Sequence, residues 1–213
     1  MKYFAISVLI VSCFTLSAFG ADETPIGKVA SLVGKSWGLW GGHKEALHLG
    51  SELFSGEMIM TESASEVTLL IAHEVAALLK GNSQAQVDQV NGKDWSLTLH
   101  QGSVLSSVRN PEHRPNHFQV RTHAAVMGVR GTTFFVKTGS DGGVFLCTCH
   151  GTVAVTSAHG VQKEFVITSQ HHDSPKNIVD GSNDVESRMK AAPVGSDHVD
   201  AEAVALEKLL NLS

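Results

Sequence analysis

Two cysteines are the residues of this sequence whose type and spacing most clearly point to chemistry. Cys147 and Cys149 lie two residues apart in the run Phe145 to Gly151. In a β-strand, residues two apart point to the same face, so one surface would present both sulfurs. The run Gln170-His171-His172-Asp173 follows about twenty residues later and supplies two imidazoles and a carboxylate.

A hairpin between the two runs would bring these groups together. Residues 157–162 look like its tip, and if His159 and Gly160 are the central turn residues, Cys147 faces His172 and Cys149 faces Gln170. A shift of one residue would substitute His171. Thiolate and imidazole groups are ligands of Zn²⁺, Cu⁺ and iron. The sequence therefore predicts one transition-metal ion at Cys147 and Cys149 with one or both of His171 and His172.

Three other interpretations of the cysteines stay open. Both could be buried thiols that pack as small apolar groups, with the histidines on the surface. A disulfide between them is disfavoured, because Cα atoms two apart in a regular strand are separated by about 6.5 Å, near the limit for a disulfide, although a bulge could allow it. Covalent haem is also disfavoured, because c-type attachment needs two residues between the cysteines and this sequence has one.

Short strands must position these side chains. From Ile26 to about Thr156 the sequence consists of β-type runs broken by Gly, Asn and Asp. We expect a single all-β domain over residues 21–176, with about ten short strands arranged as a roll, sandwich or short solenoid. The expected strands are 28–33, 58–61, 66–71, 85–90, 95–99, 103–108, 117–122, 132–138, 143–150, 152–156 and 164–168, and the ambiguous Ala-rich run 74–80 is assigned to strand as well.

The end of the chain has a different composition. Apolar residues become sparse after residue 177, and residues 181–197 mix Ser, Asn, Asp, Gly and Pro without periodicity, which predicts a mobile tail over 177–213 outside the core. Within it, residues 197–212 carry apolar side chains at helical spacing behind Ser196 or Asp197 as a cap. We expect a short amphipathic C-terminal helix that docks on the β domain.

The first twenty residues have the layout of a secretory signal peptide. Lys2 precedes an apolar run, and small residues lead to Gly20 before the chain turns polar. The expected location is periplasmic or secreted, with residues 1–20 removed. An uncleaved N-terminal anchor and a lipoprotein signal at Cys13 are the alternatives. Cleavage is favoured because the apolar stretch continues beyond Cys13.

Composition and charge limit the function classes. The chain has 213 residues, of which 42% are hydrophobic, enough to bury a core without disulfides. Without residues 1–20 it would carry 15 Lys and Arg against 21 Asp and Glu, which argues against a nucleic-acid partner.

The catalytic signatures that a sequence can reveal are absent from this one. It has no Ser-His-Asp signature, phosphate-binding loop or zinc-protease helix, and its cysteines lack the spacing of thioredoxin-type motifs. We predict that the chain is not an enzyme. A thiol-based redox enzyme, with Cys147 or Cys149 activated by His171 or His172, is one alternative. A structural protein of the cell envelope is the other.

Two stretches resemble the periplasmic FecR-type domain. The first is Leu49 to Thr61 followed by Ser65 to Leu69, in which Gly50 and Gly56 occupy turns. The second is residues 120–136, with the run Gly-Val-Arg-Gly-Thr at 128–132, and residues 151–155 fit the closing strand. The Asp-Gly-Ser turn usual after the strand that ends at Leu69 is replaced here by residues 72–74, Ala-His-Glu.

The resemblance covers about residues 26–156 and implies a periplasmic β domain. In the best-known members this domain relays occupancy of an outer-membrane TonB-dependent receptor, through one membrane helix, to a cytoplasmic sigma factor. The Cys-x-Cys-His and His-His-Asp motifs resemble one subgroup of the family. Only Met1 and Lys2 precede the apolar run, so the cytoplasmic anti-sigma region is not expected here. We expect an exported binding or signal-relay module whose partner is an envelope protein.

Overall fold

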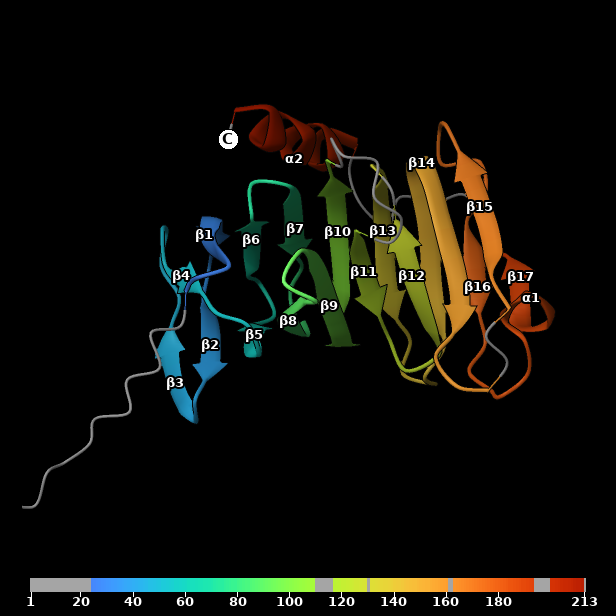
Figure 1. The fold of residues 1–213 in the computed structure, drawn as a ribbon, viewed down its shortest axis with the longest axis horizontal. Coiled ribbons are helices and arrows are strands. Elements are labelled where there is room, and N and C mark those ends of the chain that lie inside the picture. Colours follow the sequence, from blue (N-terminus) through green and yellow to red (C-terminus); the bar gives the residue numbers. More distant parts are fainter. Residues whose placement is uncertain (1–23, 110–116, 130, 161–162, 194–199, 213) are drawn as a thin grey trace, which may run out of the picture.

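The computed structural model describes residues 24–109, 117–129, 131–160, 163–193 and 200–212. These residues contain 17 strands, joined into one mixed sheet, and two helices. The expectation of a single, mostly β domain with a short C-terminal helix is confirmed. The number of strands is larger than expected, because several short strands were not recognised in the sequence (Figure 1).

The sheet has two halves. In the first half, all pairs of neighbouring strands are antiparallel. Its strands, from one edge to the other, are β4 (Glu52–Leu53), β1 (Gly27–Val33), β6 (Glu66–Ile71), β7 (Val75–Leu79), β10 (Ser103–Val108), β13 (Thr133–Thr138), the first part of β14 (Val144–Ser157), β16 (Lys176–Ile178) and β17 (Met189–Ala191).

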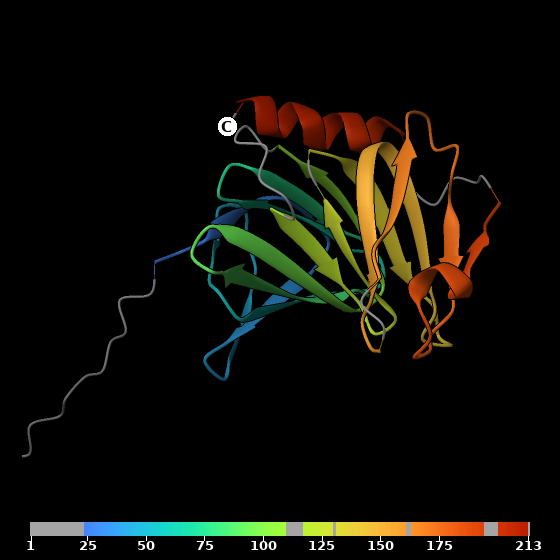
Figure 2. The same cartoon turned by 45° about the vertical axis from the view of Figure 1, so that its right-hand side comes forward.

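The second half contains a parallel pair, β9 with β11, among antiparallel neighbours. Its strands are β3 (His43–Ala46), β2 (Ser36–Trp40), β5 (Glu57–Thr61), β8 (Gln84–Val90), β9 (Asp94–Gln101), β11 (Phe118–Arg121), β12 (Ala125–Val129), the second part of β14, and β15 (Phe165–Ser169). The 14-residue strand β14 belongs to both halves and therefore links them (Figure 2).

The main hydrophobic core lies between the two halves. It includes Leu69 and Phe134 from the first half and Ile59, Leu97 and Phe118 from the second, all essentially inaccessible to solvent. Because side chains alternate along a strand, the residue after Phe134 points to the opposite face. This outer face of the first half carries its own apolar residues and needs a cover.

Helix α2 (Asp200–Leu212) supplies that cover by packing on β7 and β10. Figure 1 shows it lying across this side of the sheet. A second apolar cluster forms between them, and it includes both cysteines. Its members are Leu70, Ala76, Leu78, Leu105, Phe135, Cys147 and Cys149 from the sheet, and Ala203, Leu206 and Leu210 from α2. The expected docking of the C-terminal helix is therefore observed.

Polar contacts add to the apolar docking of α2. The Lys80 ammonium bridges Glu66 at 3.3 Å and Glu202 of α2. The Thr133 hydroxyl donates a hydrogen bond to Glu207 Oε1 at 2.8 Å. The helix is thus held along its length by the strands beneath it. Its expected caps, Ser196 and Asp197, lie outside the described residues.

The expectation of a tail outside the core after residue 177 is wrong for residues 177–191. Strand β16 pairs with β14 and β17, and helix α1 (Val185–Arg188) lies between β16 and β17 in the chain. Ile178 and Val185 belong to the main core, and the buried Arg188 donates hydrogen bonds to the Val179 and Ala124 carbonyls. Residues 177–191 can pack on the sheet with few apolar side chains, because Arg188 satisfies buried backbone carbonyls.

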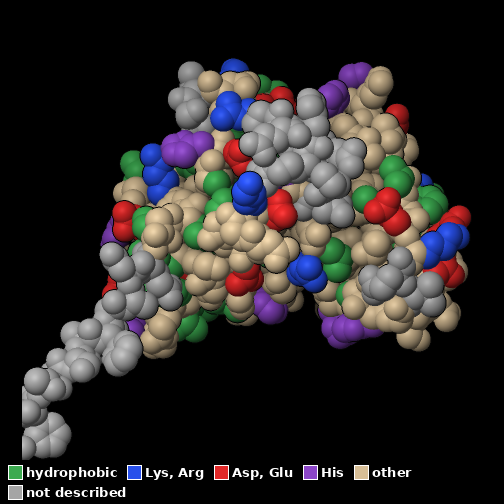
Figure 3. Space-filling view, in the orientation of Figure 1, with side chains coloured by type: hydrophobic (Ala, Val, Ile, Leu, Met, Phe, Trp, Pro, Cys, Tyr) green, Lys and Arg blue, Asp and Glu red, His purple; other side chains and the backbone are tan. Residues whose placement is uncertain are grey.

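Within the described part of the chain, neither helix has the length and apolarity needed to cross a membrane. Residues 1–20, where the sequence predicts a signal peptide, lie outside the described residues. On the face drawn in Figure 3, Lys and Arg side chains are scattered among Asp and Glu side chains.

Candidate metal site

The two cysteines sit on β14 at a break in its pairing with β13. Cys147 lies opposite Phe135 in a regular antiparallel register. The pairing then skips one residue, because Thr148 pairs with Phe134 and His150 with Thr133, so Cys149 is the extra residue of a β-bulge. Both cysteines are present as thiols, are 4% exposed, and belong to the cluster beneath α2.

Gly151 allows β14 to continue beyond the bulge into the other half of the sheet. Its φ is +109°, and a Cβ atom at this position would lie 2.8 Å from Thr132 Oγ1. That hydroxyl donates to the Thr152 carbonyl at 2.8 Å and accepts from the Thr152 amide at 3.2 Å. The close approach requires glycine, because any side chain would meet the backbone and hydroxyl of Thr132.

The hairpin register expected from the sequence is wrong by one residue. Val153 pairs with Ile167 and Ala154 with Val166, and the pairing ends at Gly151 and Ser169. Continued regularly, this register would bring His171 opposite Cys149. The chain instead leaves β15, and a turn determines which histidine reaches the cysteines.

That turn directs His172 to the thiols. His172 has a left-handed φ of +57°, and its amide donates to the Cys149 carbonyl at 3.4 Å. Ser169 and Asp173 close the turn: the Ser169 hydroxyl donates to Asp173 Oδ1 at 2.5 Å and accepts from the Asp173 amide at 3.2 Å. Asp173 therefore has a structural contact of its own, and the neighbouring His171 is exposed.

The ligand atoms of Cys147, Cys149 and His172 all lie within 4.8 Å of one another. His172 Nδ1 is 3.4 Å from Cys147 Sγ. For comparison, a tetrahedral zinc with usual bond lengths separates its sulfur and nitrogen ligands by about 3.5 Å. Three of the four predicted ligands therefore converge closely enough that they could hold one metal ion, and His171 is not among them.

Asp200, the first residue of α2, was not identified as a site residue from the sequence. Its Oδ1 atom is 3.2 Å from His172 Nε2, the ring nitrogen that faces away from the cysteines. An imidazole that binds a metal through one nitrogen usually donates the N–H of the other to a carboxylate. The amphipathic pattern of residues 197–212 was the only sequence signal for this contact, because it predicted a helix docked on the domain.

The surroundings of Cys149 raise the pKa of its thiol. The largest cause is its hydrogen bond to the Cys147 side chain, followed by burial and by the negative charges of Cys147, Asp200 and Glu207. Two thiolates side by side in this buried position are unfavourable without a cation. A metal ion would supply the missing positive charge and displace the protons.

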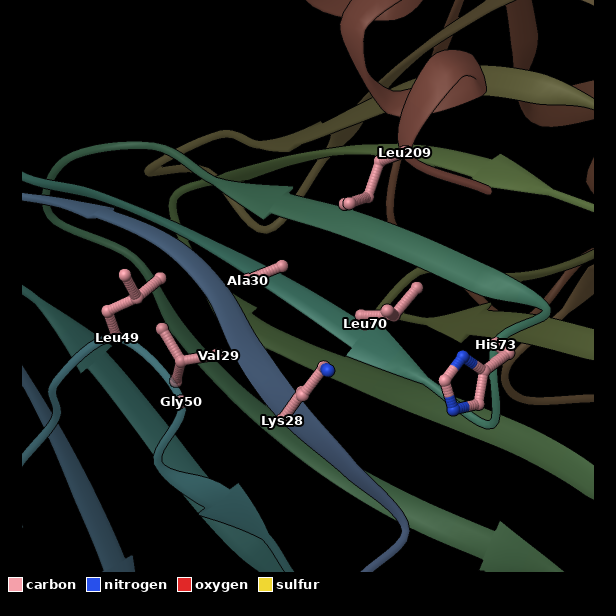
Figure 4. Close-up of a pocket in the computed structure, with 8 residues that line it drawn as sticks. All are labelled: Lys28, Val29, Ala30, Leu49, Gly50, Leu70, His73 and Leu209. Carbon is pink, nitrogen blue, oxygen red and sulfur yellow. The ribbon is translucent and has the colours of Figure 1, made fainter. Parts of the chain in front are cut away.

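A second feature of the same face is a hollow of about 340 Å³ near the C-terminal end of α2. Figure 4 shows Leu209 of α2 above Leu70 of β6 and Ala30 of β1, with Lys28 and His73 at the rim. The cover that α2 provides is thus less complete at this end than over the cysteines.

Comparison with known proteins points to one family. The family described as FecR protein matches residues 57–154. This stretch begins with β5 and ends within β14, so it contains both cysteines, whereas His172 and α2 lie beyond it. No curated protein matches the chain at a significant level.

Two crystal structures of a candidate anti-sigma factor from Parabacteroides distasonis ATCC 8503 are similar to this chain. Each has a TM-score of 0.49 and 16% sequence identity, and each match covers 64% of this chain. The match spans 60% of the length of the solved protein. The family match alone shows that residues 57–154 are similar to the FecR protein family.

Proposed function

We propose that this protein is an exported FecR-type binding or signal-relay module of the cell envelope, and that it holds one transition-metal ion at Cys147, Cys149 and His172. The observation that carries the metal proposal is the convergence of two thiols and an imidazole within 4.8 Å. The family match supports the role as a module. The signal-peptide layout of residues 1–20 supports export, and an exported module would meet its partner among envelope proteins.

The donor set favours a thiophilic metal. Two sulfurs and one imidazole suit Zn²⁺, Cu⁺ or iron, and they suit Mg²⁺ or Ca²⁺ poorly because those ions prefer oxygen ligands. Three protein ligands leave the fourth position of a tetrahedral zinc site for water or another ligand. Copper in the +1 state would also match the soft sulfur ligands.

The alternative of a thiol-based redox enzyme has weaker support. A nucleophilic cysteine needs a lowered pKa and access to substrate. The pKa of the Cys149 thiol is raised, and both cysteines lie buried beneath α2. Burial of both cysteines and the raised pKa of the Cys149 thiol therefore both disfavour a nucleophilic role.

The test is the metal content of the full chain, exported by its own leader in a bacterial host and purified without chelators. Plasma mass spectrometry should find about one thiophilic metal ion per chain, and thiol titration of the metal-loaded protein should find both cysteines protected. No metal, no uptake of added Zn²⁺ or Cu⁺, and two titratable thiols would contradict the metal proposal.

Three variants assign the ligands. Cys147→Ser and His172→Ala should each lower the affinity for Zn²⁺ by more than about tenfold, because each removes a ligand. His171→Ala is the matched control, since it removes the adjacent, exposed imidazole and should leave the affinity unchanged. Equal losses in His171→Ala and His172→Ala would contradict the assignment of His172 alone.

A further inference from the structure

We propose that the metal controls the docking of α2, and that the contact between His172 and Asp200 is the latch that couples them. This inference rests on the proposed metal site and adds its regulation. When the metal is bound, α2 stays docked over the cysteines. When the metal is lost, the docking of α2 on the sheet weakens. Asp200 acts as a positioning residue for the imidazole.

The contacts form a continuous path from the metal ligands to the helix. His172 Nδ1 faces Cys147 Sγ at 3.4 Å, and His172 Nε2 faces Asp200 Oδ1 at 3.2 Å. Because Asp200 is the first residue of α2, the same imidazole contacts both the site and the helix. The His172 amide donates a hydrogen bond to the Cys149 carbonyl, which keeps the residue beside the cysteines. Movement of α2 would therefore withdraw Asp200 from a ring that stays at the site.

The apolar contacts of α2 lead to the same ligands. Leu206 is 4% exposed and belongs to the cluster that contains Cys147 and Cys149. The helix thus covers the thiols as well as touching the imidazole. Removing it would expose the sulfurs to water and to competing ligands, which would weaken the hold on a metal ion.

Metal binding would strengthen a latch that is weak alone. The Asp200 side chain is 86% exposed, and an ion pair with such an exposed carboxylate contributes little to stability. A metal on Nδ1 fixes the proton on Nε2 and draws electron density from the ring, so the N–H becomes a better donor to the carboxylate. The carboxylate in turn makes Nδ1 a better ligand.

The other end of α2 has fewer restraints. Leu209 borders the hollow shown in Figure 4, and both Leu209 and Ala30 there are only partly buried. Asp200 and Leu206 are the residues of α2 that link the helix to the His172 ring and to the cluster of the cysteines. If α2 is released, the apolar surface of Leu78, Leu105 and Phe135 becomes available, and this change would be the signal that the module passes on.

Hydrogen exchange of the α2 amides in the full chain measures the coupling. Adding Zn²⁺ or Cu⁺ to the metal-free protein should slow exchange in α2 by about tenfold to a hundredfold, the range over which such outer contacts tune metal affinity. The amides of β8, on the other half of the sheet, serve as the internal reference and should not respond. Equal protection of α2 with and without metal would overturn the inference.

Substitutions at Asp200 test the latch itself. Asp200→Asn should lower Zn²⁺ affinity by about tenfold to a hundredfold and abolish the effect of metal on α2 exchange, and Asp200→Glu should restore part of both. With Co²⁺ as the probe, the thiolate charge-transfer bands of Asp200→Asn should persist at saturation, because both sulfurs are still ligands. Wild-type affinity and exchange in Asp200→Asn would refute the latch.

A matched pair on α2 tests the reverse direction. Leu206→Asp places a charge in the apolar cluster, whereas Val204→Asp places the same charge on the exposed side of the helix, where Val204 is 47% exposed. Because coupling is reciprocal, Leu206→Asp should weaken Zn²⁺ binding and Val204→Asp should not. If wild type binds no metal, the proposed site fails. If it binds one ion but neither variant changes its affinity, only the coupling fails.

Discussion

At the scale of single residues, the candidate site shows which inferences a sequence supports. The two-residue spacing of Cys147 and Cys149 predicted a shared face, and the structure places both in one cluster. His172 was predicted to face Cys147, and it does, although a left-handed turn brings it there in place of the expected register. Backbone conformations of this kind in a non-glycine residue leave almost no trace in sequence.

Glu57 provides a residue-scale prediction that is independent of the metal. Burial raises the pKa of this carboxyl, the Phe54 amide opposes the shift, and the charge of Glu45 adds to it. Because the folded-state pKa lies above the ordinary value of 4.5, ionisation costs the folded protein stability as pH rises from about 4.5 through the raised pKa. Glu57→Gln removes this cost.

For Glu57→Gln we expect the melting temperature, taken relative to that of wild type, to be higher at pH 7 than at pH 4. Glutamine can still accept the hydrogen bond that Glu57 takes from the Phe54 amide at 3.0 Å. Glu52→Gln is the control for the loss of one negative charge, because it makes the same substitution at an exposed side chain of β4. A pH-independent difference for Glu57→Gln would contradict a raised pKa at this carboxyl.

At the scale of elements, β14 is decisive because it carries the cysteines, the bulge and the passage between the halves of the sheet. Its two parts were expected as separate strands, 143–150 and 152–156, since Gly151 interrupts the run. The structure shows one strand whose glycine adopts a conformation open only to that residue. Regular pairing rules therefore predicted the components of this strand but not the bulge between them.

Gly151→Ala tests the importance of this passage. We expect it to lower the free energy of unfolding by about 1–3 kcal/mol. Alanine is strained at this positive φ, and its Cβ would also lie 2.8 Å from Thr132 Oγ1. Gly92→Ala is matched to it, since Gly92 also has a positive φ but open space around its Cβ position. Urea unfolding should show the larger loss for Gly151→Ala. Equal losses would mean that the contact with Thr132 is easily relieved.

Two features of the sequence hid some of the strands. Strands β2 and β12 contain Gly38 and Gly128, which break the β-type pattern, and β16 and β17 lie in polar sequence. Glu57 Oε1 would lie 2.1 Å from a Cβ at Gly38, so that glycine serves close packing and does not mark a turn. Short strands in polar sequence are stabilised by partners distant in the chain, which local patterns do not reveal.

At the scale of the whole molecule, the candidate site joins two parts of the chain. The cysteines lie within the stretch that matches the FecR family, whereas His172 and Asp200 lie beyond it. The expected tail after residue 177 instead adds β16 and β17 to the sheet, and its helix covers the cluster that contains the thiols, as expected. The proposed metal would therefore connect the FecR-like stretch of the β domain to the helix that covers it.

X-ray absorption at the metal edge of the zinc-loaded full chain tests the metal site most directly, because it identifies the atoms bound to the ion. The structure predicts two sulfur neighbours at about 2.3 Å and one imidazole nitrogen at about 2.0–2.1 Å, with one sulfur lost in Cys147→Ser. A zinc ion bound only by nitrogen and oxygen, with no sulfur neighbour, would contradict a metal site at Cys147, Cys149 and His172.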